Sequence, residues 1–205
     1  MGFFSENSKF MQFMGRLVDV LLLNLLWLVF CLPLVTIGAA TVAAFSVTLK
    51  MVDDEEGYIA RNFVKAFRDN FRKSTIVWLL NALVLYALYI DVQIIIKADN
   101  PPLVLIIVGI ISAFFIFFAF IYAYPQIARY ENKIKATLEN SVRICFRFPG
   151  RTGLLLGILA LELGLFVWNT YMMLFGVLVG PMLIIYTISG ISKRIFQDID
   201  RQNQG

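Results

Sequence analysis

Four polar residues stand apart inside long apolar stretches of the sequence: Asn24, Asn81, Asp91 and Glu162. Amides and carboxylates are scarce in membrane-spanning segments, where they tend to face the bundle interior or a cavity. Asp91 and Glu162 occupy similar depths in their stretches, so together they would suit a cation or a polar solute. Under this interpretation, the protein is a small transporter or channel. The alternative is that each side chain hydrogen-bonds to a neighbouring helix or stays wet near the membrane surface.

Two basic segments have the periodicity of amphipathic helices. In residues 55–73, aromatic side chains recur every fourth position, and basic side chains follow on the other side. These candidate docking residues are Phe63, Phe67 and Phe71, opposed by Arg61, Arg68 and Arg72. In residues 131–147, Arg143 and Arg147 oppose a stripe of apolar residues. Each helix is expected either to dock a partner protein or to lie in the headgroup layer with its basic side toward anionic lipid.

The composition argues against most catalytic chemistry. The chain has no His, which removes the usual neutral-pH acid or base and the commonest metal ligand. Cys31 and Cys145 are isolated, and the sequence contains neither a phosphate-binding loop nor a nucleophile elbow. We therefore expect no enzyme activity, no catalytic residues, no cofactor and no metal. The net charge of +4 requires no nucleic-acid partner, because the basic residues flank apolar stretches where they would meet lipid headgroups.

The elements that position these residues follow from the distribution of Lys and Arg. All 18 lie outside four apolar windows, residues 17–49, 74–96, 98–128 and 152–192. A charge at the centre of a bilayer costs about 2.5–3.5 kcal/mol, so the pattern predicts a polytopic membrane protein. The expected membrane segments are residues 17–32, 35–49, 74–96, 103–124, 152–168 and 171–192.

The first window permits two interpretations, because one straight helix over residues 17–49 would be about 50 Å long. Pro33 and Gly38 near its middle favour a break. Either two short spans are joined by a tight bend, or one span is followed by a re-entrant or interfacial piece. Two spans place 17 of the 18 basic residues on one side. We therefore favour six segments with both termini in the cytoplasm.

The predicted fold class is all-α, a polytopic membrane helical bundle of five to six segments built as hairpins, with cytoplasmic amphipathic helices. A single integral membrane domain is expected over residues 1–205, because no polar stretch is long enough for a separate soluble domain. Membrane lipid is an expected partner. The small-residue spacing in the last two segments suits packing within the final hairpin and is also compatible with a homo-oligomer.

Two neighbouring stretches resemble a known family. They are LPLVTIGAAT at residues 32–41 and, after an acidic turn with Gly57, FVKAFRDNF at residues 63–71. In order and spacing they resemble the YesL-like family of bacterial membrane proteins, whose function is unknown and whose members are often encoded beside carbohydrate ABC importers. The resemblance implies the bacterial plasma membrane as the location. It also implies an accessory membrane component linked to sugar uptake, and it supplies no catalytic residues. Together with the two basic, aromatic-rich segments, it leads to the hypothesis of a non-enzymatic accessory protein that contacts permease or ATPase subunits of such an importer through its cytoplasmic amphipathic helices.

Overall fold

The computed structural model describes residues 9–53, 57–97 and 102–204 of the 205-residue chain, and all regular structure in these ranges is helical. The elements are α1 (Lys9–Cys31), the 3-10 turn η1 (Leu34–Thr36), α2 (Ile37–Met51), α3 (Ile59–Lys97), α4 (Leu103–Arg129), α5 (Ile134–Arg147), α6 (Pro149–Val167) and α7 (Thr170–Gln204). Among the described residues, five helices are long and apolar enough to cross a membrane. The predicted fold class is therefore confirmed.

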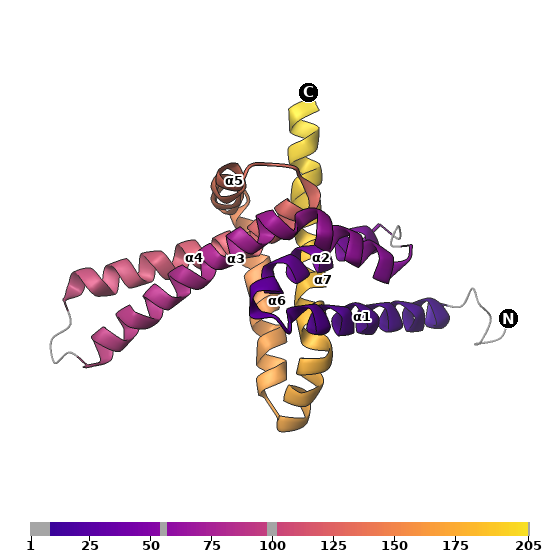
Figure 1. Cartoon of the computed structure of the whole chain (residues 1–205), viewed down its shortest axis with the longest axis horizontal. Coiled ribbons are helices and arrows are strands. Elements are labelled where there is room, and N and C mark those ends of the chain that lie inside the picture. The colour runs from indigo at the N-terminus through magenta and orange to yellow at the C-terminus, as the bar shows by residue number, and fades with distance from the viewer. Residues whose placement is uncertain (1–8, 54–56, 98–101, 205) are drawn as a thin grey trace.

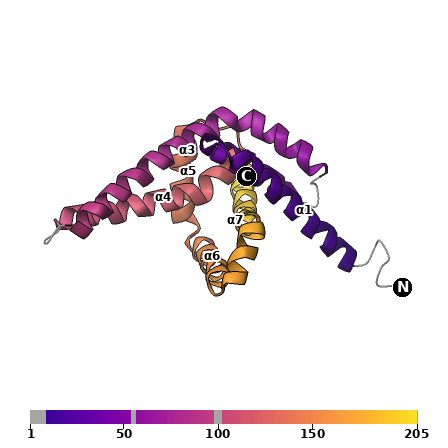
Figure 2. The same ribbon diagram turned by 60° about the horizontal axis from the view of Figure 1, so that its bottom comes forward.

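The helices form three arms that diverge from a common centre (Figures 1 and 2). One arm is the α3–α4 hairpin, the second is the α6–α7 hairpin, and α1 forms the third. Helix α5 and the C-terminal part of α7 lie on the side away from the two hairpin tips (Figure 1). We call this side, with residues 129–151 and 193–204, the charged end.

Several helices run further than the predicted segments. The amphipathic segment at 55–73 and the segment at 74–96 are parts of one helix, α3, of 39 residues. The last membrane segment and the polar tail likewise form the single 35-residue helix α7. Helix α4 continues through Pro125 to Arg129, five residues beyond the predicted end of that segment at residue 124. A proline is tolerated inside a membrane helix where neighbouring groups satisfy the freed carbonyl.

A tight bend at residues 32–36 separates α1 from α2, as Pro33 predicted. The hydroxyl of Thr36 donates to the carbonyl oxygens of Pro33 at 2.7 Å and Phe30 at 2.5 Å. The bond to Phe30 satisfies a carbonyl in the last turn of α1, whereas the Pro33 carbonyl also accepts from the backbone N–H of Thr36 at 2.9 Å. Residues 17–49 therefore form two helices with a compact connection.

Helix α2 is the centre of the molecule. Its small residues Ala39, Ala40, Ala43 and Ala44 are all fully buried, as expected for a helix packed against other helices rather than lipid. Gly38 allows the closest approach, because a Cβ at this position would lie 2.5 Å from the Cβ of Trp78 and 2.6 Å from the carbonyl oxygen of Ser74.

The two ends of α2 contact different helices. Gly38 packs against Ser74, where the apolar part of α3 begins, and the Thr48 hydroxyl lies 2.6 Å from that of Ser189 near the end of the apolar part of α7. Helix α2 therefore joins the bases of the arms and does not follow either hairpin to its tip.

Candidate functional site at the charged end

The C-terminal part of α7 connects the other helices at the charged end. Asp200 accepts a hydrogen bond from Arg129 at 2.8 Å and another from the Tyr130 hydroxyl at 2.8 Å, both beyond the apolar part of α4. Asp198 forms an ion pair with Arg151 of α6 at 2.7 Å. At the start of this region, Lys193 is buried and forms an ion pair with Asp53 after α2.

Aromatic packing supports this network. The ring of Tyr130 packs edge-on against Phe196 at 5.4 Å, and the Arg129 guanidinium lies 5.7 Å from the centre of the Phe196 ring. Burial raises the pKa of Tyr130 to about 12, and its hydrogen bond to Asp200 acts in the same direction. The phenol therefore stays neutral at physiological pH and remains a hydrogen-bond donor.

A polar pocket of about 380 Å³ opens between the end of α4, helix α5 and the C-terminal part of α7. Its polar lining consists of Gln126, Tyr130, Asn132, Asn140, Arg143, Arg147 and Asp200. The two arginines are the predicted docking residues of the second amphipathic helix. Arg147 also donates to the side chain of Gln202, so α5 is tied to α7.

The aromatic stripe of α3 is divided between the interior and the surface. Phe63 is fully buried, and the rings of Phe63 and Phe67 pack edge-on against Phe30 at 5.3 and 4.8 Å. These two rings belong to the internal packing of α1 on α3, because the bend after α1 brings Phe30 against them. Phe71 is exposed and is the member of the stripe that remains open to contact.

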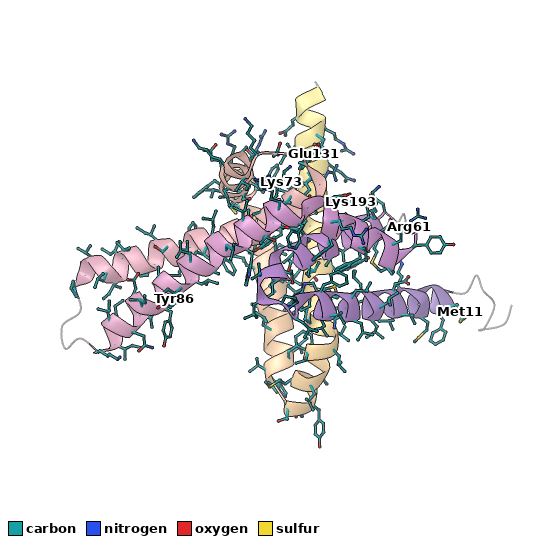
Figure 3. The ribbon with its side chains drawn as sticks, viewed as in Figure 1. Met11, Arg61, Lys73, Tyr86, Glu131 and Lys193 are labelled. Atoms are coloured by element: carbon teal, nitrogen blue, oxygen red, sulfur yellow. The ribbon has the colours of Figure 1, made fainter. Side chains whose placement is uncertain are left out.

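The basic side of α3 is exposed throughout. Arg61, Arg68 and Arg72 all lie on the surface, and Arg61 projects at the edge of the molecule (Figure 3). Tyr58, just before the helix, is 83% exposed. We call Tyr58, Arg61, Arg68, Phe71 and Arg72 the outer face of α3. Sequence periodicity identified four of these residues, whereas Tyr58 precedes the helix and carries no periodic signal.

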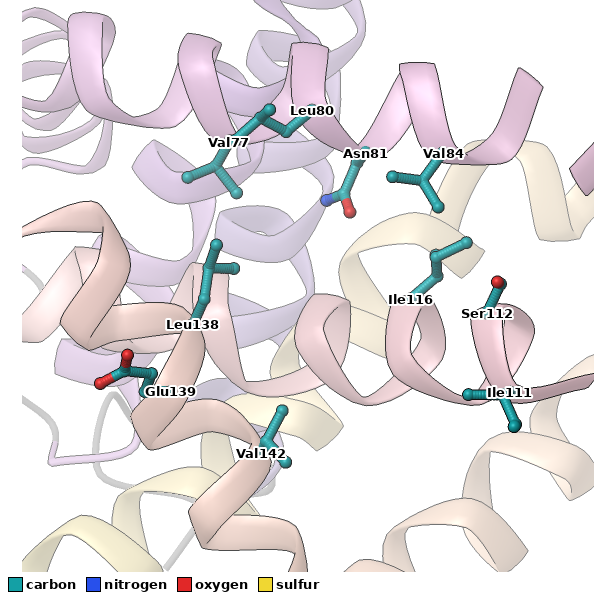
Figure 4. Close-up of a pocket in the computed structure, with 10 residues that line it drawn as sticks. All are labelled: Val77, Leu80, Asn81, Val84, Ile111, Ser112, Ile116, Leu138, Glu139 and Val142. Atoms are coloured by element: carbon teal, nitrogen blue, oxygen red, sulfur yellow. The ribbon is translucent and has the colours of Figure 1, made fainter. Parts of the chain in front are cut away.

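Asn24 and Asn81, two of the predicted intramembrane polar residues, form hydrogen bonds to neighbouring helices. The buried Asn24 donates to the carbonyl oxygen of Leu178, which ties α1 to α7. Asn81 donates to the hydroxyl of Tyr124 at 3.3 Å, which ties α3 to α4. Asn81 also borders an apolar pocket of about 640 Å³ between α3, α4 and α5 (Figure 4). Both amides therefore act as interhelical hydrogen-bond donors.

The two carboxylates lie on different arms. Glu162 on α6 accepts a hydrogen bond from Thr187 of α7 at 2.6 Å, and its second oxygen is buried without a hydrogen-bond partner among the described residues. Asp91 is half-buried near the far end of α3. These arms diverge (Figure 1), so Asp91 and Glu162 do not face each other as the sequence suggested. No cluster of three or more metal-ligating side chains occurs in the described ranges.

Thr187 is a functional candidate that the sequence did not reveal. It lines a cavity of about 470 Å³ that runs between α6 and α7 to the Asp53–Lys193 ion pair. The same hydroxyl donates to Glu162, so the cavity reaches the partner of the buried carboxylate. A lone threonine in an apolar helix gives no signal of its own, because its role depends on which residue the facing helix presents.

Comparison of this sequence with known proteins finds one family and one relative. Residues 20–92 match the family described as "Protein of unknown function, DUF624". This part of the chain, about a third of its length, is therefore similar to the DUF624 family. The chain is also 28% identical over 190 residues to "Uncharacterized protein YesL" of Bacillus subtilis (strain 168), covering 89% of this chain and 87% of that protein, and is thus a distant homologue. No solved structure matches significantly. The resemblance to the YesL-like family is confirmed.

The DUF624 segment coincides with the structural centre of the molecule. Residues 20–92 include about half of α1, all of α2 and nearly all of α3. The segment therefore contains the Phe30 contacts, the Gly38 approach and the outer face of α3. Glu162, the polar pocket and the C-terminal part of α7 lie outside the DUF624 match.

Proposed function

We propose that this protein is a non-enzymatic accessory subunit of a carbohydrate ABC importer in the bacterial plasma membrane. The contact is made by the outer face of α3. The observation that carries this proposal is the division of one amphipathic helix into two roles. Phe63 and Phe67 are used internally, while Tyr58, Phe71 and three arginines remain exposed.

The chemistry of this face suits a protein partner. Tyr, Phe and Arg are enriched in protein–protein interfaces, where a few aromatic and Arg side chains supply most of the binding energy. A bare basic face would also attract anionic lipid. The choice of an importer permease or ATPase subunit as the partner rests on the family resemblance.

Co-purification tests the proposal. A tagged protein in mild detergent is expected to recover permease or ATPase subunits, and the triple variant Y58A/R61A/F71A is expected to lose at least about 90% of them. The matched control is Tyr171→Ala, which removes a tyrosine that is 79% exposed at the opposite end of the α6–α7 hairpin. Recovery of the protein with lipid alone, or equal recovery by the triple variant, would contradict the docking role.

A second candidate function is a small transporter or channel. The cavity between α6 and α7 supports it, because this cavity links the charged end to Thr187 and thereby to Glu162. In proteoliposomes, proton or sodium flux would then fall in both Glu162→Gln and Thr187→Ala. Asp91→Asn serves as the control because Asp91 lies on another arm. Flux that is absent from the wild-type protein, or equal in all variants, would remove this candidate.

A further inference from the structure

We propose that the polar pocket between α4, α5 and the C-terminal part of α7 binds a phosphate group. This site is separate from the outer face of α3 and does not depend on a partner protein. Its binding groups are Arg143, Arg147 and the side-chain amides of Asn132 and Asn140. The charges that face the pocket, their spacing and the rigidity of the pocket wall all suit a bound phosphate.

The charge around the pocket is unbalanced in favour of an anion. Asp200 is the carboxylate in the lining, and it already accepts from Arg129 and Tyr130 at 2.8 Å each. Arg147 donates to Gln202, which is neutral. Among the described residues, no carboxylate forms an ion pair with Arg143 or Arg147. Two guanidinium groups thus face the pocket without compensating charge.

The spacing of these groups suits a tetrahedral oxyanion. Arg143 and Arg147 are four residues apart on α5, and Asn140 precedes Arg143 by three, so all three side chains share one face of the helix. Guanidinium forks bind phosphate oxygens in a bidentate manner, and the amides supply further donors. The volume of about 380 Å³ lies within the range of small-molecule sites.

Buried hydrogen bonds hold the pocket wall in place. The buried Gln126 donates to the Ser141 hydroxyl at 2.9 Å, which fixes α5 against the end of α4. Ser141 in turn donates to the carbonyl oxygen of Thr137 at 2.8 Å. On the other side, Tyr130 is held by Phe196 and Asp200. A preorganised wall lowers the cost of ordering side chains when a ligand binds.

The position of the pocket allows two sources of phosphate. Asp200 lies eight residues beyond Ser192, or about 12 Å along α7 past the apolar stretch. A headgroup layer extends roughly 5–8 Å beyond the hydrocarbon on each side. A lipid phosphate reaching up from the membrane and a soluble phosphate are therefore the two sources that the experiment separates.

The test is calorimetric titration of the full-length protein in neutral detergent. The probes are inorganic phosphate and short-chain dihexanoyl phosphatidic acid. The double variant R143Q/R147Q is expected to bind at least about tenfold more weakly. The matched control K133Q/K135Q removes the same charge from exposed positions at the start of α5, outside the pocket lining, and is expected to bind as the wild type does. A further variant, R143K/R147K, keeps the charge and is expected to restore part of the affinity, which separates loss of binding from loss of folding.

Each outcome bears on the proposal. Tighter binding of the lipid identifies a lipid headgroup site, and equal or tighter binding of inorganic phosphate identifies a site for a soluble ligand. Failure of the wild-type protein to bind either probe would overturn the proposal. So would an equal loss of affinity in K133Q/K135Q, because that result would reflect general attraction of anions to a basic surface.

Discussion

Gly38 should be among the least replaceable residues of the protein. In Gly38→Ala, the new Cβ would lie 2.5 Å from the Cβ of Trp78 and 2.6 Å from the carbonyl oxygen of Ser74. Carbon atoms pack at about 3.5–4.0 Å, so α2 and α3 must separate by roughly 1 Å. Neither neighbouring atom is at the end of a flexible side chain. We therefore expect a loss near the upper part of the 1–3 kcal/mol range for overpacking, about 2–3 kcal/mol.

Thermal unfolding in mild detergent measures this effect. For a chain of this size, the loss corresponds to a decrease in Tm of roughly 5–10 °C. Gly153→Ala is the matched control, because nothing lies within 4 Å of its added Cβ on α6. This control is expected to be neutral or slightly stabilising, since Ala favours a helix by about 1 kcal/mol over Gly. Equal Tm values for Gly38→Ala and the wild type would refute the close packing of α2 on α3.

Three further predictions concern Phe63, Tyr130 and Cys145. In denaturant unfolding, Phe63→Ala is expected to lower the free energy of unfolding by about 3–5 kcal/mol, and Phe71→Ala by less than about 1 kcal/mol. Similar losses in the two variants would contradict the finding that Phe63 is buried inside the molecule while Phe71 is exposed. In a spectrophotometric titration, Tyr130→Phe should remove a phenol that ionises near pH 12 rather than near 10. Because folding raises the pKa of Tyr130, this residue contributes its full stabilisation below pH 10, and the contribution declines as the pH rises through 12. Burial raises the pKa of the Cys145 thiol to about 12. This thiol should therefore react with maleimide at pH 7 much more slowly than a cysteine that replaces the exposed Tyr58. Equal reaction rates would contradict the burial of Cys145.

The sequence predicts the helices well and their packing partners poorly. Windows free of Lys and Arg identify the apolar parts of the helices because the bilayer imposes that pattern directly. Pro33 predicts the break between α1 and α2, since an interior proline lacks an N–H and the bend here is compact. The same rule applied to Pro125 would end α4 near residue 124, yet the helix continues to Arg129.

The division of the α3 stripe required the tertiary structure. Periodicity places Phe63, Phe67 and Phe71 on one side of a helix, but it does not indicate how far along that side another helix extends. Phe30 reaches the first two rings and stops short of the third. The separation of Asp91 and Glu162 has a similar origin, because the angle between two hairpins depends on packing at their bases.

The ion-pair network at the charged end was also missed. Asp198 and Asp200 lie in a polar stretch at the end of the chain, and the same composition is typical of a solvated tail. Their partners, Arg151 and Arg129, lie on helices far away in the sequence. A helical continuation of α7 brings these charges together, and no local pattern distinguishes such a continuation from a free terminus.

The docking role of the outer face of α3 can be tested most directly by photocrosslinking in native membranes. A benzoylphenylalanine would replace Phe71, with the same replacement at Tyr171 as the control. If the outer face of α3 docks on an importer, the position-71 protein forms adducts with an ABC permease or ATPase subunit, identified by mass spectrometry, and the position-171 protein forms none. Adducts with lipid alone at position 71, or the same protein adducts from both positions, would contradict the docking role.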